Sequence, residues 1–129
     1  MTAGYSGTPL VRKLGIRAEG RVLVDGGPPD LDLGVQPQRR PGAAPYDVIV
    51  LFAPDAARLH RRWPALAPRL TVAGRFWVCW PKRSSGLQTD LSENDIREYG
   101  LAQGLVDVKV CAVDDVWSGL AFVRRLADR

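Results

Sequence analysis

Hydrophobic residues form two runs that are typical of strands buried on both faces. The first run is YDVIVLF at residues 46–52, and the second is GRFWVCWP at residues 74–81. Strands of this kind lie inside sheets that helices cover on both sides. Because successive side chains of a strand alternate, Trp80 would face one side of the sheet and Trp77 and Cys79 the other. The sequence therefore predicts a central, mostly parallel sheet.

Polar and turn-forming residues around these runs indicate where helices begin and end. Thr8 and Pro9 suit the N-cap and the first position of a short N-terminal helix. Asp55 can cap a second helix directly after the first buried run. Pro64 and Pro68 would make this second helix end or bend early. Helices are thus predicted before and between the strands.

The C-terminal third of the chain predicts one more helix and a strand pair. Ser92 starts the helix, with Asp95 as the acidic member of a capping box, and the apolar face extends to Leu105. Two apolar runs follow, VKVCAV at 108–113 and GLAFVRRL at 119–126. The short DDVWS segment between them predicts a hairpin-like, antiparallel connection.

The segment before the first long strand is the weakest in pattern. RVLVDGG at 21–27 predicts a short strand, but residues 28–45 are rich in proline and predict a loop with at most one strand, around 31–35. The fold class is therefore α/β: a three-layer, Rossmann-like, mostly parallel sheet with helices on both faces, a shortened second and third strand region, and a C-terminal antiparallel strand pair. The length predicts a single domain over residues 1–129.

Composition narrows the class of protein further. Hydrophobic residues make up 46% of the chain and charged residues 25%, values that are ordinary for a globular domain. The apolar run at 48–53 is far too short to span a bilayer, and the first residues carry no export signal. Cys79 and Cys111 have neither metal-ligand nor CxxC spacing. We therefore expect a cytoplasmic protein with reduced cysteines and no membrane contact.

Positive charge is concentrated in the middle of the chain. The net charge is +4, and residues 46–83 hold seven Lys/Arg against two Asp/Glu. Arg58, Arg61 and Arg62 could attract phosphates or an acidic partner, or could form a solvated helix face. A nucleic-acid binder usually has a denser basic stripe with exposed aromatic residues. The sequence therefore predicts no nucleic-acid partner.

Three segments resemble parts of class I S-adenosylmethionine (SAM)-dependent methyltransferases. KLGIRAEGRVLVDGG at 13–27 resembles the entry helix, first strand and glycine-rich turn of that family, and YDVIVLF resembles its fourth strand. LAPRLTVAGRFWVCWPK at 66–82 resembles its fifth strand, and the last two strands suit its antiparallel pair. The whole chain also resembles a family of small bacterial proteins known only as a domain of unknown function.

The resemblance implies that Asp25, Gly26 and Gly27 would contact a SAM cofactor. Pro28 and Pro29, however, stand where the family opens a helix with free N–H groups. The 21 residues between Val24 and Tyr46 are too few for the two helices and two strands that the family has there. Asp30 or Asp32 could stand in for the family's ribose-binding acid. We therefore predict no cofactor, with SAM binding as the disfavoured alternative.

The loop PKRSSGLQTD leaves the carboxyl end of the second buried run, where open α/β sheets bind ligands. It offers positive charge, hydroxyl donors and a glycine that permits close backbone approach. These features suit a small anion or a nucleotide, although the loop matches no phosphate-binding motif. The structural alternative is that the loop is only a polar connection between a strand and a helix.

Other residues with chemical potential have structural interpretations that we favour. His60 has no carboxylate or cysteine near it in sequence, so an exposed helical histidine is favoured over a general base. Asp114 and Asp115 suit a solvated turn better than an acid–base pair. Trp117 could stack on a flat ligand, but packing is favoured. No catalytic and no metal-binding residues are predicted.

The sequence thus predicts a non-catalytic binding module on a reduced methyltransferase-like scaffold. Its ligand would be a small anion or nucleotide, a protein partner, or a second copy of the chain. The alternative is a SAM-dependent methyltransferase or a related transferase. The candidate ligand-binding residues are Asp25, Gly26, Gly27, Lys82, Arg83, Ser84, Ser85, Thr89, Asp90 and Trp117.

Overall fold

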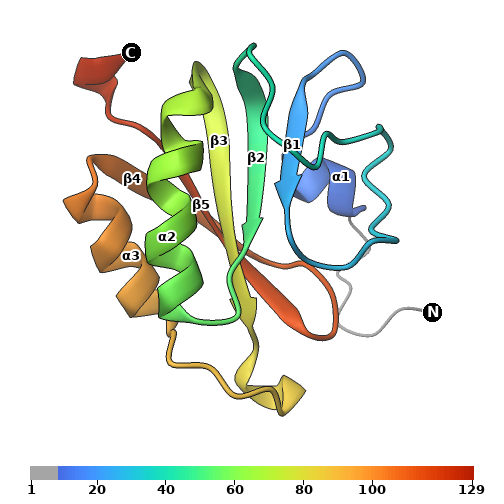
Figure 1. Cartoon of the computed structure of the whole chain (residues 1–129), viewed down its shortest axis with the longest axis vertical. Coiled ribbons are helices and arrows are strands. Elements are labelled where there is room, and N and C mark those ends of the chain that lie inside the picture. The colour runs from blue at the N-terminus through green and yellow to red at the C-terminus, as the bar shows by residue number, and fades with distance from the viewer. Residues whose placement is uncertain (1–8) are drawn as a thin grey trace.

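The computed structural model describes residues 9–129 and contains a five-stranded sheet with helices packed on it (Figure 1). The helices are α1 (Leu10–Lys13), α2 (Ala56–Leu66) and α3 (Glu93–Ala102). The strands are β1 (Val22–Asp25), β2 (Tyr46–Phe52), β3 (Leu70–Pro81), β4 (Leu105–Ala112) and β5 (Trp117–Arg124). Short 3-10 turns lie at η1 (Ala67–Arg69), η2 (Arg83–Ser85) and η3 (Leu126–Asp128). The predicted cap Thr8 lies outside the described residues.

The strands are ordered β1-β2-β3-β5-β4 across the sheet. β1, β2 and β3 run parallel, whereas β5 is antiparallel to both β3 and β4. The register aligns Val24 with Val50, Val50 with Trp77, and Trp77 with Ala121. These four side chains pack in one hydrophobic cluster on the same face of the sheet. The predicted parallel sheet with an antiparallel pair at its end is confirmed.

Each face of the sheet has its own core. α2 and α3 cover one face together (Figure 1), and Trp80 of β3 packs with Trp63 of α2 in the core beneath them. α1 and Leu33 of the proline-rich segment cover the other face, where Trp77 and Cys79 are fully buried. Burying these large apolar side chains is the main favourable contribution to folding. The expected assignment of alternate β3 residues to opposite faces is correct.

The predicted caps of α2 and α3 are confirmed, whereas Pro9 is the N-cap of α1 and not its first helical residue. The side chain of Asp55 accepts a hydrogen bond from the backbone N–H of Arg58 at 2.9 Å, which satisfies a free donor at the start of α2. α2 continues through Pro64 and ends at Leu66, where η1 with its proline follows. Ser92 and Asp95 form the reciprocal capping box of α3.

One boundary prediction is wrong, and the proline-rich segment, predicted to hold at most one strand, pairs with the sheet at a different residue. α3 ends at Ala102, so Leu105 opens β4 and does not belong to the helix. Gly104 ends the helix with a φ of +96°, a conformation that glycine adopts without strain. Residues 31–35 form no strand. Instead, Gln38 pairs with β1, because its backbone exchanges hydrogen bonds of 2.8 Å with Val22 and Val24.

This single paired residue is all that remains of a second strand in the shortened segment between β1 and β2. The prolines of that segment cannot donate ladder hydrogen bonds. Leu33 is nonetheless 1% exposed. The segment therefore covers the core that contains Trp77 and Cys79, although it adds no full strand to the sheet. Among residues 9–129, no helix has the length and apolar character needed to cross a membrane.

Candidate functional site

The carboxyl ends of β1, β2 and β3 meet at one edge of the sheet, because the three strands are parallel. Ligands of open α/β sheets bind at such an edge. Two groups of candidate residues lie there. One is the diglycine turn, residues 25–27, at the end of β1. The other is the loop of residues 82–93, which connects β3 to α3.

The diglycine turn depends on both of its glycines. Gly26 and Gly27 each have a φ of +79°, which strains any residue with a Cβ. A Cβ at Gly27 would also overlap the aromatic ring of Phe52 at the end of β2. A Cβ at Gly26 would lie 3.0 Å from the Arg58 guanidinium. The turn is therefore packed directly against side chains from β2 and α2.

Asp25, the last residue of β1, begins this turn and is held by two arginines of α2. Asp25 is 7% exposed. One carboxylate oxygen pairs with Arg58, and the other accepts from Arg62, whose nitrogens lie 2.7 and 2.8 Å away. Arg58 also donates to the carbonyl of Phe52 at 3.0 Å. Partial burial makes these pairs stronger than exposed ones, so they fix α2 against the end of β1.

Trp117 joins the same group through an aromatic contact. Its ring meets that of Phe52 edge-on, with centroids 5.1 Å apart and an interplanar angle of 85°. Asp114 holds the β4–β5 turn by accepting from the backbone N–H groups of Val116 and Trp117, each at 2.8 Å. Asp114 thus has a structural role. The tertiary structure brings together four of the predicted residues: Asp25, Gly26, Gly27 and Trp117.

The remaining predicted residues lie on the 82–93 loop, and several of them stabilise it internally. The Ser85 hydroxyl donates to the Lys82 carbonyl at 2.6 Å and accepts from the backbone N–H of Leu87 at 3.2 Å. Thr89 accepts from the backbone N–H of Leu91 at 3.1 Å. Arg83 and Ser84 are exposed. Whether the loop binds an anion stays a prediction.

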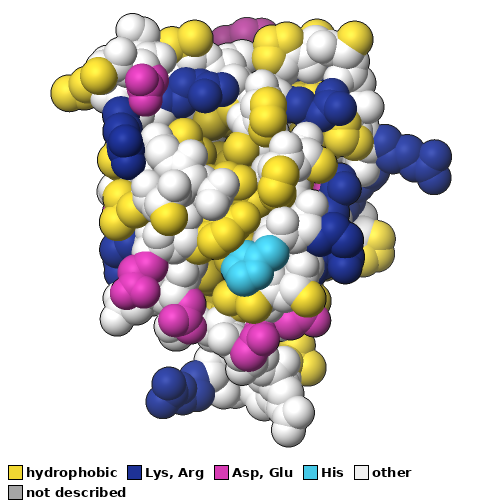
Figure 2. Space-filling view, turned by 60° about the vertical axis from the view of Figure 1, so that its left-hand side comes forward, with side chains coloured by type: hydrophobic (Ala, Val, Ile, Leu, Met, Phe, Trp, Pro, Cys, Tyr) yellow, Lys and Arg dark blue, Asp and Glu magenta, His cyan; other side chains and the backbone are white. Residues whose placement is uncertain are grey.

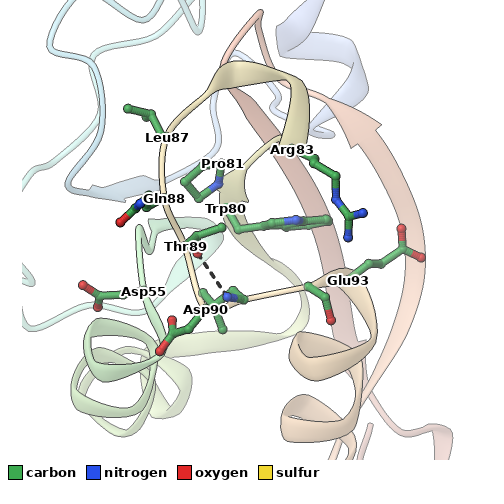
Figure 3. Close-up of a pocket in the computed structure, with 11 residues that line it drawn as sticks. Asp55, Trp80, Pro81, Arg83, Leu87, Gln88, Thr89, Asp90 and Glu93 are labelled. Atoms are coloured by element: carbon green, nitrogen blue, oxygen red, sulfur yellow. Dashed lines mark hydrogen bonds between the residues drawn. The ribbon is translucent and has the colours of Figure 1, made fainter.

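A cavity of about 720 Å³ opens between this loop, the end of β3 and the start of α2 (Figure 3). Asp90 of the loop reaches across it and accepts from the backbone N–H of Ala56 at 2.8 Å. Asp55 lines the same space and caps the same helix. The lining is completed by Trp80, Pro81, Arg83, Leu87, Gln88, Thr89, Leu91, Ser92 and Glu93. Of the predicted residues, Arg83, Thr89 and Asp90 line this cavity.

Sequence reasoning missed Phe52, Trp80, and the roles of Arg58 and Arg62. The spacing of the two arginines by four residues on a helix was a usable signal, since it places them on one face. Their pairing with Asp25 leaves Arg61 as the one member of that basic group outside the ion pairs. The sequence pattern of Phe52 and Trp80 indicates only core residues, because no local signal distinguishes a site residue at the end of a buried strand.

The histidine lies away from both groups, whereas the cysteines pack in the core beneath the diglycine turn, where Cys79 is the register partner of Phe52. His60 is exposed, as expected, on the helical face seen in Figure 2, and its ring lies 4.7 Å from that of Tyr99. Burial raises the pKa of the Cys79 thiol well above its ordinary value and also raises the pKa of Cys111, which disfavours thiolate chemistry. In residues 9–129 no group of three or more His, Cys, Asp or Glu could hold a metal ion.

No family model and no curated protein matches the sequence. Solved structures do resemble the fold. A ribosomal protein L11 methylase from Lactobacillus delbrueckii subsp. bulgaricus aligns with a TM-score of 0.57 and 13% identity, over 90% of this chain and 75% of its own. The magnesium protoporphyrin IX methyltransferase of Synechocystis PCC 6803, with bound SAM, gives 0.52 and 14%, over 90% and 74%. A complex of DhpI with SAH gives 0.53 and 12%, over 90% and 71%.

One sequence-based prediction needs correction on this evidence. We predicted no cofactor, but two of these three similar structures are complexes with SAM or SAH. Those two proteins hold the cofactor on scaffolds of this fold, which contradicts our prediction of no cofactor. At such low identity the similarity shows the fold alone. The chain has a trimmed class I SAM-methyltransferase-like fold, with the Rossmann-like sheet order retained and the segment between β1 and β2 shortened.

Proposed function

We propose that this chain is a SAM-binding domain of the methyltransferase type. One observation carries the proposal: the sheet order β1-β2-β3-β5-β4 with a diglycine turn directly at the carboxyl end of β1. In sheets of this kind a glycine turn after the first strand lets the backbone approach a ligand closely. The chain keeps that turn although the elements between β1 and β2 are reduced.

The residues around the turn fit the chemistry of SAM. Its methionine end carries an ammonium and a carboxylate group, and the chain offers the Asp25 carboxylate for the first and Arg58 and Arg62 for the second. The ring of Trp117 suits the flat part of a nucleoside. When bound, SAM supplies an electrophilic methyl group. The chain's own residues would bind and orient it.

Binding at the turn requires one rearrangement. Phe52 and Arg58 occupy the space beside the two glycines, so a ligand there must displace the ring and exchange one ion pair for another. Such a displacement lowers the apparent affinity by the free energy it costs. A smaller side chain at position 52 should therefore strengthen binding.

Calorimetric titration with SAM and SAH tests the proposal. We expect a dissociation constant on the order of micromolar for one of the two ligands, and tighter binding by the Phe52→Leu variant. Gly27→Ala should weaken binding, whereas Gly86→Ala should not, although both glycines have a φ of +79°. The absence of any binding heat from either ligand, in both the wild type and Phe52→Leu, would overturn the proposal.

The second candidate is a ligand-binding module without methyl transfer. The exposed Arg83 and Ser84 at the start of the 82–93 loop favour it. Its ligand would be a small anion or a nucleotide at Lys82 to Asp90, or a protein partner or second copy in place of a small molecule. If the anion is correct, phosphate or nucleotide should raise the melting temperature of the wild type but not of Lys82→Ala. An unchanged melting temperature with every anion would remove that option, and light scattering would detect a dimer.

A further inference from the structure

The cavity of about 720 Å³ beside the 82–93 loop is lined by a tryptophan whose indole N–H has no protein acceptor among residues 9–129. Trp80 lines the cavity and is 8% exposed. Its indole N–H donates to no residue in the part of the chain that the structure describes, whereas the equivalent N–H of Trp77 donates to the Leu14 carbonyl at 3.0 Å. No side-chain N or O in the described range is both sealed from solvent and unpaired, so the Trp80 N–H is accessible to solvent, and Trp80 lines the cavity.

The charge of the cavity lining is predominantly negative. Asp55, Asp90 and Glu93 line it, and Arg83 is the one cationic side chain among its lining residues. Figure 2 shows acidic side chains gathered at the lower end of the face that α2 and α3 form, where these two helices begin. Glu93 forms a salt bridge with Arg97 at 2.5 Å. Asp55 and Asp90 have no cationic partner among residues 9–129.

The same two aspartates make the cavity a poor site for an anion. A helix N-terminus attracts anions through its free N–H groups and its dipole. At α2 those donors are already taken, because Ala56 donates to Asp90 and Arg58 donates to Asp55. A second anion would find occupied donors and two uncompensated carboxylates. A cation would be attracted to both carboxylates.

The aromatic ring adds a second attraction of the same sign. Figure 3 shows the Trp80 ring lying across the cavity, with residues 87–90 on one side and Arg83 and Glu93 on the other. The face of an indole attracts ammonium and guanidinium groups more strongly than other aromatic rings do. The indole N–H, in contrast, can donate to an acceptor such as a carbonyl oxygen. A ligand that carries both groups would use both features of the ring.

We infer that this cavity binds an organic cation that bears a hydrogen-bond acceptor: an alkylammonium group close to a carbonyl, as in a lysine residue with its amide groups. The cavity volume lies in the range of small-molecule sites. The inference stands on the cavity alone, and it does not require the diglycine turn to bind SAM.

Titration of the full chain with Nα-acetyl-lysine amide, without SAM, tests the inference. The readout is the indole N–H resonances in a ¹H–¹⁵N spectrum, where the signal missing from Trp80→Phe identifies Trp80. We expect saturable movement of that signal by the lysine probe. The neutral Nα-acetyl-glutamine amide should bind at least about tenfold more weakly. Three results would overturn the inference: equal binding of the lysine and glutamine probes, tighter binding of Nα-acetyl-glutamate amide than of the lysine probe, or no movement of the Trp80 signal with any probe up to about 10 mM.

Two further arms separate the contributions of charge and hydrogen bonding. The double variant Asp55→Asn/Asp90→Asn keeps oxygens that can accept the two helix hydrogen bonds and should weaken lysine-probe binding about tenfold. The matched control Asp115→Asn removes one charge from an exposed residue outside the cavity and should change nothing. 1,4-Diaminobutane is a cation without an acceptor, so binding as tight as that of the lysine probe would contradict the role given to Trp80.

Discussion

The diglycine turn and the 82–93 loop lie at the same edge of the sheet, but they are held in different ways. Long-range contacts close the turn: Asp25 pairs with Arg58 and Arg62, and Phe52 packs against Gly27. Short-range hydrogen bonds hold most of the loop, as between Ser85 and Lys82, one long-range bond joins Asp90 to the Ala56 N–H, and a cavity stays open beside the loop. The comparison teaches that one edge of a fold can carry one site filled by the chain's own side chains and another that remains accessible.

The largest effect should come from removing the ring that fills the turn. Phe52 is 1% exposed, so Phe52→Ala should lower the free energy of unfolding by about 4 kcal/mol. Leu87 on the loop is 52% exposed, and Leu87→Ala should change it by less than about 0.5 kcal/mol. Urea unfolding of both variants gives the two values. Similar losses would show that the turn is no better packed than the loop.

The same isosteric change in the two regions should also give unequal results. Asp25→Asn removes the charge between two guanidinium groups and should cost about 3 kcal/mol of stability. Asp90→Asn keeps an oxygen for the Ala56 N–H and should cost less than about 0.5 kcal/mol. The measurement is chemical denaturation at neutral pH. A small effect at Asp25 would mean that its ion pairs only balance the cost of desolvation.

Two glycines with the same backbone conformation provide a closer test. Gly27 and Gly86 both have a φ of +79°, but a Cβ at Gly86 would have no neighbour within 4 Å. Gly86→Ala should therefore cost only backbone strain, about 1 kcal/mol. Gly27→Ala adds overlap with the Phe52 ring and should cost about 2 kcal/mol more. Thermal unfolding compares the pair, and equal costs would contradict the close packing of the turn.

The smallest effect concerns the helix cap that borders the cavity. Asp55→Ala removes the acceptor of the Arg58 N–H and should cost about 1 kcal/mol, whereas Asp55→Asn should be nearly neutral, since asparagine caps as well as aspartate does. Circular dichroism during thermal unfolding measures both. A large loss in Asp55→Asn would show that the charge of Asp55, and not its cap, stabilises α2.

Much of the fold could be predicted because its signals are local. The apolar run of β2, the two-faced pattern of β3 and the caps Asp55 and Ser92 each depend on neighbouring residues. The predictions failed where tertiary contacts decided the outcome. Gln38 pairs with β1 although its segment has no strand pattern. Leu105 belongs to β4 because it pairs with Arg124 of β5.

The sequence alone predicted the order of strands and helices, the two buried faces of β3 and the presence of a glycine turn after β1. These follow from side-chain periodicity and from the conformational freedom of glycine. The tertiary structure alone decided that Asp25 meets two arginines more than thirty positions away, and that Trp80 keeps an unpaired N–H beside Asp55 and Asp90. Both results depend on how α2 lies on the sheet, and no local pattern encodes that placement.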